Sequence, residues 1–245
     1  MLHLEEVGST NDWLRENASQ FGDGQWVRAD RQTSGRGRVG RQWQMPQGNL
    51  AASCLIRPQP GEGWAAELGF VAALALHDVV AGFVETSRLQ LKWPNDLLLD
   101  EAKLSGILLE READVIILGI GVNLAVAPVL PDRRTIALAE VGIEISAPGF
   151  ANLLAEAFGR RREMWRKHSF HPIRSDWLER AHPFGTRLLV TSGEGKIAGS
   201  FAGLDTDGAL LLDGDDGKAH RIHAGDVWQP GPATGAEPVG GKEKG

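Results

Sequence analysis

The chain has 245 residues, 42 % hydrophobic and 24 % charged, a composition that accommodates one large domain and a small one and does not require disulfides or metal for stability. Its net charge of −6 argues against a general nucleic-acid binder, so we expect no DNA partner. The chain has a single cysteine, Cys54, which excludes a disulfide framework and favours a cytoplasmic location. It has no apolar run long enough to span a membrane.

Residues 3 to 7 are predicted to form a short strand, which a polar run follows. Ser9, Thr10 and Asn11 in this run are good N-caps, so a helix is expected to begin here. Capping of the helix would be enough to explain why these three polar residues occur here. A corner between a strand and a helix is also a good place to hydrogen-bond a small ligand, and the sequence leaves both interpretations open.

The densest positive charge lies at residues 31 to 43, where four arginines alternate with three glycines before Trp43. The segment reads Arg31-Gln32-Thr33-Ser34-Gly35-Arg36-Gly37-Arg38-Val39-Gly40-Arg41-Gln42-Trp43. Glycine lets backbone N–H groups approach an anion closely, and guanidinium groups match phosphate and carboxylate oxygens. We therefore predict a loop that binds a phosphate-bearing ligand, with a solvated surface loop as the alternative.

The glycines of this loop also spell the GxGxxG pattern of dinucleotide-binding folds. That pattern requires a following helix and an acid about 20 residues later. Here Pro46 and Gly48 interrupt the chain, residues 49 to 57 read as a strand, and another strand at residues 26 to 30 leads into the loop. The context therefore excludes a Rossmann site.

Residues 64 to 83 have apolar side chains at helical spacing and predict a long helix. Two strands then flank Pro94, and Lys92, Asn95 and Asp96 surround the corner. The corner is typical of a hairpin turn. The alternative is a polar triad for phosphate oxygens and a divalent ion.

Residues 103 to 110 form the next predicted strand, with Lys103 at its start and Gly106 where a backbone or ligand would pass close. Residues 114 to 124 read as an apolar strand with Asn123 near its end. Asn123 either forms a turn there or makes a buried polar contact to a ligand, and the sequence leaves both open. The helix expected at residues 150 to 168 carries a basic run that we interpret as a solvated face.

Residues 173 to 181 are expected to continue helically. After residue 183 the pattern changes to short alternating runs, at 186 to 192, 196 to 204, 208 to 212 and 218 to 222. These predict a small β-barrel. Residues 231 to 245 are rich in Gly, Pro, Glu and Lys, a composition typical of a disordered tail.

Five motifs in this order closely resemble the biotin protein ligases over most of residues 3 to 230. They are Gly8-Ser9-Thr10-Asn11, Gly35-Arg36-Gly37-Arg38-Val39-Gly40-Arg41-Gln42-Trp43, Lys92-Trp93-Pro94-Asn95-Asp96, Lys103-x-x-Gly106-Ile107-Leu108 and Gly119-x-Gly121-x-Asn123. The family's bifunctional members carry a winged helix-turn-helix first, whereas these motifs begin by residue 8. The resemblance therefore implies a monofunctional ligase without a DNA-binding domain.

The resemblance implies an α+β fold with a catalytic domain like class II aminoacyl-tRNA synthetases, at residues 1–183. Its mixed, largely antiparallel sheet would carry helices on one side. A C-terminal SH3-like β-barrel would occupy residues 184–230, followed by the disordered tail at 231–245. The implied reaction forms biotinyl-5′-AMP from biotin and MgATP and then transfers biotin to a lysine of a biotin carboxyl carrier protein or domain.

The resemblance also assigns roles. Biotin would be bound by Ser9, Thr10, Asn11, Gln32, Gly35, Arg36, Gly37, Arg38, Lys103 and Gly106. ATP would be bound by Arg36, Arg38, Arg41, Trp43, Lys92, Asn95, Asp96 and Asn123. Lys103 and Arg38 would be catalytic, with Lys103 bridging the carboxylate and the α-phosphate, and Asp96 would hold Mg²⁺.

Two other functions remain as alternatives. A lipoate or octanoyl transfer enzyme would share the fold, although not the loop of residues 35 to 43 together with Lys92-Trp93-Pro94-Asn95-Asp96. A non-catalytic regulator would bind biotin or nucleotide but has no use for Lys103, Asp96 and the loop arginines together. The sequence does not identify the acceptor carboxylase or the oligomeric state. A homodimer could form if edge strands around residues 115 to 124 paired between two protomers.

Overall fold

The computed structural model describes residues 1–59, 62, 65–193 and 195–229. Their larger sheet has the strand order β1-β2-β3-β7-β6-β5-β4. The strands are β1 (Leu2–Val7), β2 (Gln25–Gln32), β3 (Leu50–Ile56), β4 (Leu89–Lys92), β5 (Asp96–Leu99), β6 (Ala102–Glu112) and β7 (Val115–Val122). Strands β1 and β2 run parallel and the other neighbours pair antiparallel, which confirms the predicted mixed sheet.

The centre of this sheet is made by β3 and β7, in which every residue is buried. Strands covered on both faces need near-continuous apolar sequences, and both strands have them. Because β7 lies between β3 and β6, its backbone groups are already paired on both sides. The expectation that residues 115 to 124 form an edge available to a second protomer is therefore wrong; β1 and β4 are the edges.

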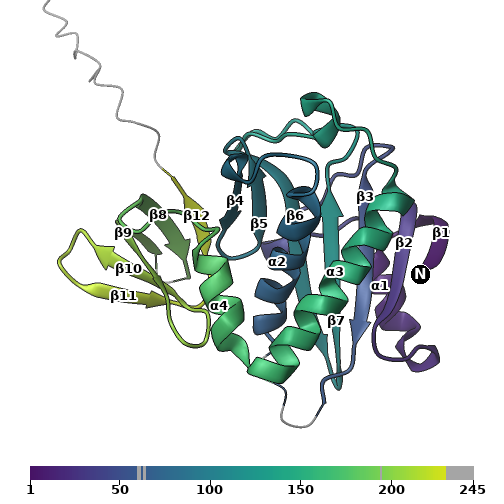
Figure 1. The fold of residues 1–245 in the computed structure, drawn as a ribbon, viewed down its shortest axis with the longest axis horizontal. Helices are drawn as coiled ribbons and strands as arrows, with labels where there is room; N and C mark the ends of the chain where they lie inside the picture. The colour runs from purple at the N-terminus through teal and green to yellow at the C-terminus, as the bar shows by residue number, and fades with distance from the viewer. Residues whose placement is uncertain (60–61, 63–64, 194, 230–245) are drawn as a thin grey trace, which may run out of the picture.

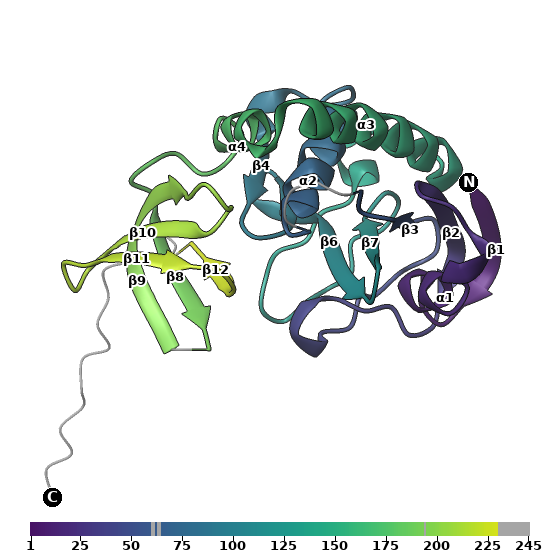
Figure 2. The same ribbon diagram turned by 90° about the horizontal axis from the view of Figure 1, so that it is seen from below.

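Helices α2 (Glu67–Val80), α3 (Ala147–His168) and α4 (Phe170–Leu178) cover one face of the large sheet (Figures 1 and 2). Helix α1 (Thr10–Glu16) lies on the opposite face. Alternation along β7 explains the division, because Ile117 packs with Leu14 of α1 while Leu118 joins the core under the long helices. The expectation of helices on one side alone is wrong for α1.

The basic run of α3 is a solvated face only in part: Arg160, Arg166 and Lys167 are exposed, whereas Arg161 and Arg162 are not. Arg161 lies 2.6 Å from Asp78 and 2.5 Å from Asp176, and Arg162 is 6 % exposed and 2.9 Å from Asp23. These arginines tie α3 to neighbouring segments through ion pairs. None of the helices among the described residues is long and apolar enough to cross a membrane.

The smaller sheet is antiparallel, with the order β11-β10-β9-β8-β12. Its strands are β8 (Arg187–Ser192), β9 (Gly195–Leu204), β10 (Leu210–Gly214), β11 (Ala219–Ile222) and β12 (Asp226–Trp228). The four predicted runs match β8 to β11, whereas β12 is too short to show an alternation. Among the described residues β11 and β12 are unpaired edges, so the sheet does not close into the predicted barrel. The predicted disordered tail at 231–245 lies outside the described residues.

The small sheet is docked on the large one by a buried contact. Trp93, which follows β4, donates its indole N–H to the Gly208 carbonyl at 3.1 Å. Gly208 has φ +85°, and a Cβ there would lie 2.6 Å from Phe70, so a larger residue would be excluded. This contact brings β12 beside the strands that carry the predicted site residues.

Candidate functional site

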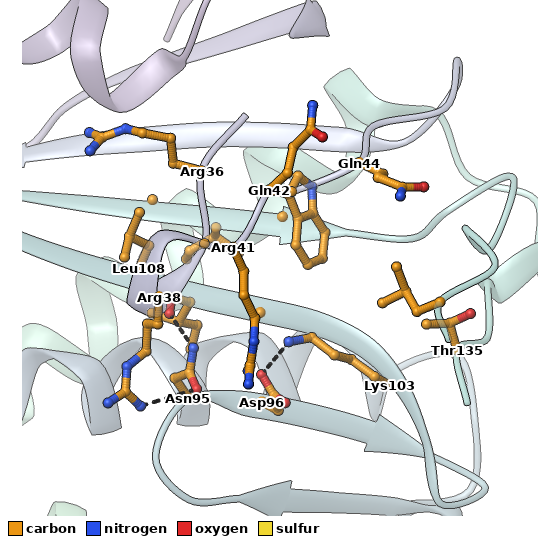
Figure 3. Close-up of a pocket in the computed structure, with 18 of the residues that line it drawn as sticks. Arg36, Arg38, Arg41, Gln42, Gln44, Asn95, Asp96, Lys103, Leu108 and Thr135 are labelled. Atoms are coloured by element: carbon orange, nitrogen blue, oxygen red, sulfur yellow. Dashed lines mark hydrogen bonds and ion pairs between the residues drawn. The ribbon is translucent and has the colours of Figure 1, made fainter. Parts of the chain in front are cut away.

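A cavity of about 380 Å³ opens on the face of the large sheet that carries α1 (Figure 3). The structure brings together every predicted site residue except Gly35 on its lining. These are Ser9, Thr10, Asn11, Gln32, Arg36, Gly37, Arg38, Arg41, Trp43, Lys92, Asn95, Asp96, Lys103, Gly106 and Asn123. Residues that lie up to 114 positions apart in the chain therefore form one pocket.

Two glycines of β7 form the floor of the cavity. Strand alternation places Gly119 and Gly121 of β7 on the cavity face. A Cβ on Gly121 would lie 2.2 Å from the Trp43 ring, and one on Gly119 would lie 2.4 Å from the side-chain oxygen of Asn11. These positions are glycine because other side chains occupy the space directly above the strand.

A network of amide and hydroxyl groups closes one end of the cavity. Ser9 caps α1 by accepting from the Asp12 N–H at 3.4 Å, so the capping interpretation is correct for it. Thr10 donates from both its backbone N–H and its hydroxyl to Gln32 Oε1, at 2.7 and 2.9 Å. The Gln32 carbonyl oxygen is therefore occupied, whereas its NH₂ group makes no hydrogen bond among the described residues.

Two residues that the sequence did not single out hold Asn11 in this network. The Ser53 hydroxyl lies 2.6 Å from Asn11 Oδ1, and Asn11 Nδ2 donates to Glu110 Oε2 at 2.7 Å. Ser53 is completely buried on β3, and Glu110 lies on β6, 99 residues from Asn11. Because both contacts are long-range, nothing in the local sequence indicated them.

The arginine-glycine loop folds back on itself between β2 and β3. Trp43 N–H donates to the Gly35 carbonyl at 2.9 Å, and Gly37 N–H donates to the Arg41 carbonyl at 2.7 Å. A Cβ on Gly35 would lie 2.5 Å from the Trp43 carbonyl oxygen. Gly35 therefore shapes the turn and does not line the cavity, in contrast to its predicted contact with biotin.

The arginines of the loop point in different directions. Arg36 lies 2.8 Å from both Asp12 and Glu110, and Figure 3 shows its guanidinium turned away from Lys103. Arg41 makes a two-pronged ion pair with Asp226 of β12, at 3.1 and 2.5 Å. The loop is thus tied to the large sheet on one side and to the small sheet on the other.

Arg38 lines the cavity beside Asn95, with Nη1 3.5 Å from Oδ1 (Figure 3). Burial lowers the pKa of its guanidinium, and the carboxylates of Asp226 and Asp96 oppose that shift. Asn95 in turn donates to the Ile107 carbonyl at 2.7 Å. A desolvated cation of this kind interacts strongly with an anionic ligand.

Lys103 and Asp96 form the ion pair at the centre of the charged end. Lys103 Nζ lies 2.6 Å from Asp96 Oδ1, and Arg133 Nη1 lies 3.8 Å from Asp96 Oδ2 (Figure 3). Lys92 is also largely enclosed here, and burial lowers its pKa. Lys103 Nζ lies 5.7 Å from the centre of the Trp43 ring, which places the indole in the middle of the cavity.

Asn123 follows β7 directly and is 1 % exposed. Its Nδ2 donates to the Lys103 and Ile136 carbonyls at 3.3 and 3.2 Å, so it fixes the segment that carries the lysine. Its Oδ1 is buried with no hydrogen-bond partner among the described residues. Asn123 is thus a buried polar residue with one acceptor unsatisfied among the described residues, and its predicted contact to a ligand stays a prediction.

Several lining residues were missed by the sequence analysis. Arg133 and Thr135 belong to the loop after β7, and Asp226 and Trp228 belong to β12. The pair of arginines at 133 and 134 was a local signal for the first loop. Nothing local marked β12, because it reaches the cavity only through the docking of the small sheet.

The charges of the cavity suit a ligand with several negative groups. Its basic lining residues are Arg36, Arg38, Arg41, Lys92, Lys103 and Arg133, and its acidic ones are Asp96, Asp132 and Asp226. Within the described part of the chain, no group of three His, Cys, Asp or Glu side chains is placed to hold a metal ion. Asp96, the predicted Mg²⁺ ligand, already faces Lys103 and Arg133, so it fits a metal only as one ligand among those supplied by a bound phosphate.

Comparisons with known proteins agree with this geometry. The chain matches the Biotin/lipoate A/B protein ligase family over residues 4–126 and the Biotin protein ligase C terminal domain over residues 185–228. It is 40 % identical to the biotin--[acetyl-CoA-carboxylase] ligase of Paracoccus denitrificans, covering 88 % of this chain and 95 % of that protein. It is 31 % identical to the bifunctional ligase/repressor BirA of Escherichia coli, covering 86 % of this chain and 68 % of that protein.

Among solved structures, the chain is similar to the biotin protein ligase from Aquifex aeolicus in complex with biotin and ATP. The TM-score is 0.81 and the sequence identity is 29 %. The similarity covers 93 % of this chain and 97 % of the other.

Proposed function

The chain belongs to the Biotin/lipoate A/B protein ligase family, and we propose that its pocket joins biotin to a carrier lysine through biotinyl-5′-AMP. The protein is an ATP-dependent biotin protein ligase. One observation carries the assignment of the reaction to this pocket: a single cavity joins the amide and hydroxyl end at Thr10 and Gln32 to the cationic end at Lys103 and Arg38.

The amide and hydroxyl end would bind the ureido ring of biotin. A urea offers one carbonyl acceptor and two N–H donors. The free NH₂ group of Gln32 suits the carbonyl, and the hydroxyl oxygens of Ser9 and Thr10 suit the N–H groups. Asn11 is held by Ser53 and Glu110, so it adds a fixed polar edge without having to reorganise when biotin binds.

Biotin lying from this end toward Lys103 would place its carboxylate at the charged end. In the first half-reaction a carboxylate oxygen attacks the α-phosphorus of ATP, and the bond to pyrophosphate breaks. Two anions must approach each other, so fixed cations lower the barrier more than an enzyme nucleophile would. We assign Lys103 to bridge the carboxylate and the α-phosphate, and Arg38 to neutralise the acyl phosphate.

The remaining charged residues would hold the nucleotide. Arg36 and Arg41 would reach the ATP phosphates after exchanging their present carboxylate partners for phosphate oxygens, with Lys92 and Asn95 beside them. Trp43 would lie against the adenine, and Asn123 would also contact the nucleotide. Mg²⁺ would arrive with ATP, and Asp96 is the carboxylate placed to complete its coordination.

In the second half-reaction a neutral lysine amine of a biotin carboxyl carrier protein would attack the acyl carbon, and AMP would leave. We expect the carrier lysine to reach the pocket beside Arg38, which lines it. The carrier is the partner that the relatives' names imply, and which carboxylase supplies it is a matter for experiment.

Three finer expectations belong to this proposal. The catalytic part at 1–183 would be related in fold to class II aminoacyl-tRNA synthetases, and the part at 184–230 would be an SH3-like module. The enzyme would act in the cytoplasm, where the buried thiol of Cys54 stays reduced. A homodimer, if it forms, would use a surface other than β7.

Pyrophosphate release tests the proposal. The protein is incubated with MgATP and either biotin or lipoate, and a carrier domain is then added and weighed by mass spectrometry. Biotin-dependent release followed by one biotinyl group on one carrier lysine supports it. Release with lipoate alone would assign the protein to the lipoate branch of the family, and biotin binding without release would indicate a regulator.

A further inference from the structure

The pocket contains an aromatic ring supplied by the small sheet. Trp228 of β12 lines the cavity, and the centre of its ring lies 5.6 Å from Lys92 Nζ and 5.2 Å from the guanidinium carbon of Arg133. Both distances are within the range in which a cation is attracted by the electron-rich face of an indole. One ring therefore contacts two of the cations at the charged end.

These cations repel each other. Lys92, Arg133 and Lys103 share the carboxylate of Asp96, and burial leaves Lys92 poorly solvated. Asp226 also acts on Lys92 and Arg133, and Arg133 is paired with Asp132 at 2.7 Å, so the acids offset the repulsion only in part. The indole face offsets the repulsion without adding a negative charge, so the two cations remain available to an anionic ligand.

The position of the Trp228 ring is fixed by contacts of β12 on both sides. Trp228 pairs with Leu189 of β8, and the neighbouring Val227 is 3 % exposed. Two residues earlier, Asp226 holds Arg41 through the two-pronged ion pair. The position of β12 is thus fixed by the small sheet on one side and by the arginine-glycine loop on the other.

We propose that Trp228 is a positioning residue of the nucleotide site, which holds Lys92 and Arg133 at the phosphate end of the pocket. The small sheet would then set the affinity for the triphosphate of ATP, while biotin binding depends on the opposite end. This inference rests on the proposed function. It assigns no contact between Trp228 and a reacting atom.

Replacing Trp228 with leucine tests it, because leucine keeps an apolar side chain but has no electron-rich face. Losing two partly shielded cation–ring contacts should raise the KM for MgATP in pyrophosphate release by about 5- to 30-fold. Trp228→Phe keeps a weaker ring and should recover part of the loss, to within about 2- to 5-fold of the wild type. Biotin affinity measured by calorimetry without ATP should be unchanged in both variants.

Phe184→Leu is the matched control. Phe184 is a 67 % exposed aromatic residue near the start of the small sheet, where it stacks on Phe201 at 5.7 Å and does not line the cavity. Its replacement should leave the KM for MgATP unchanged. If Trp228→Leu raises the KM for MgATP no more than this control does, the inference is overturned.

Fluorination gives a second test that preserves the shape of the ring. Site-specific replacement of Trp228 by tryptophans with one, two and three fluorines should raise the KM for MgATP in graded steps, since each fluorine weakens the π face. If the KM for MgATP rises in Trp228→Leu but does not change on fluorination, the loss of packing alone explains the rise, and the cation–ring role is refuted. A wild-type protein without biotin-dependent pyrophosphate release would instead refute the proposed function.

Discussion

Gly119→Ala is expected to damage the biotin end of the pocket selectively. The new methyl group would lie 2.4 Å from Asn11 Oδ1 and 3.0 Å from the amide carbon and nitrogen. Gly119 lies on β7, which is paired on both sides, so Asn11 must move rather than the strand. Its contacts of 2.6 Å to Ser53 and 2.7 Å to Glu110 would then be lost.

The magnitude follows from the two hydrogen bonds that Asn11 loses. A neutral hydrogen bond contributes about 0.5–1.5 kcal/mol and one to a charged group about 1.5–3 kcal/mol, so the contacts to Ser53 and Glu110 together contribute roughly 2–4 kcal/mol. A cost of roughly 2–4 kcal/mol in the binding-competent state weakens biotin binding by about 30- to 1,000-fold. The KM for MgATP should change much less, because the cationic end does not contact Gly119.

Calorimetry with biotin is the assay, with two variants beside it. Gly69→Ala in α2 adds a methyl group where nothing lies within 4 Å, and should leave biotin binding unchanged. In the background of Asn11→Ala, where the clashing side chain is absent, Gly119→Ala should have little further effect. Wild-type biotin affinity in Gly119→Ala, or an equal loss in the Asn11→Ala background, would show that a clash with Asn11 is not responsible.

Three further predictions concern the charged end and the stability. Lys103→Met should lower biotin-dependent pyrophosphate release by about 10²- to 10³-fold, as for other preorganised charge-stabilising groups, while calorimetry should show a much smaller loss of biotin affinity because the contacts at the ureido end are kept. Arg38→Gly should weaken retention of biotinyl-5′-AMP, so that peptide mass spectrometry finds biotin on lysines of bystander proteins; labelling confined to the carrier would contradict this. Burial lowers the pKa of His77 and His182 to about 4. Unfolding raises each pKa back to about 6.5, so the unfolded chain binds more protons and the free energy of unfolding should fall by up to about 2 kcal/mol per histidine between pH 7 and pH 5. Denaturant titrations at the two pH values measure the fall, and His182→Gln should reduce it.

The parts of the fold that depend on local pattern were predictable. The buried strands β3 and β7 are continuous apolar runs, and the corner at Ser9 is a recognisable N-cap. Gly119 and Gly121 alternate with apolar residues, and that spacing alone places both on one face of β7. The sequence accordingly singled out Ser9 at this corner, whereas Ala51 and Ala52 of β3, which also line the pocket, were not identified.

The parts that depend on contacts between distant segments were not predictable. Arg36 reaches Glu110 across 74 residues, and Arg41 reaches Asp226 across 185. Strand β12 has three residues, too few for an alternation to appear. The position of β7 inside the sheet was missed for the same reason, because strand order is set by pairing between segments and not by the sequence of any one of them.

The most direct test of the account is the mass of a biotin carrier domain after incubation with the protein, biotin and MgATP. We expect an increase of one biotinyl group on a single lysine, which disappears when biotin or ATP is omitted and is strongly reduced in Lys103→Met. An unmodified carrier, or a Lys103→Met variant that modifies it at the wild-type rate, would contradict the assignment of this pocket as the ligase site.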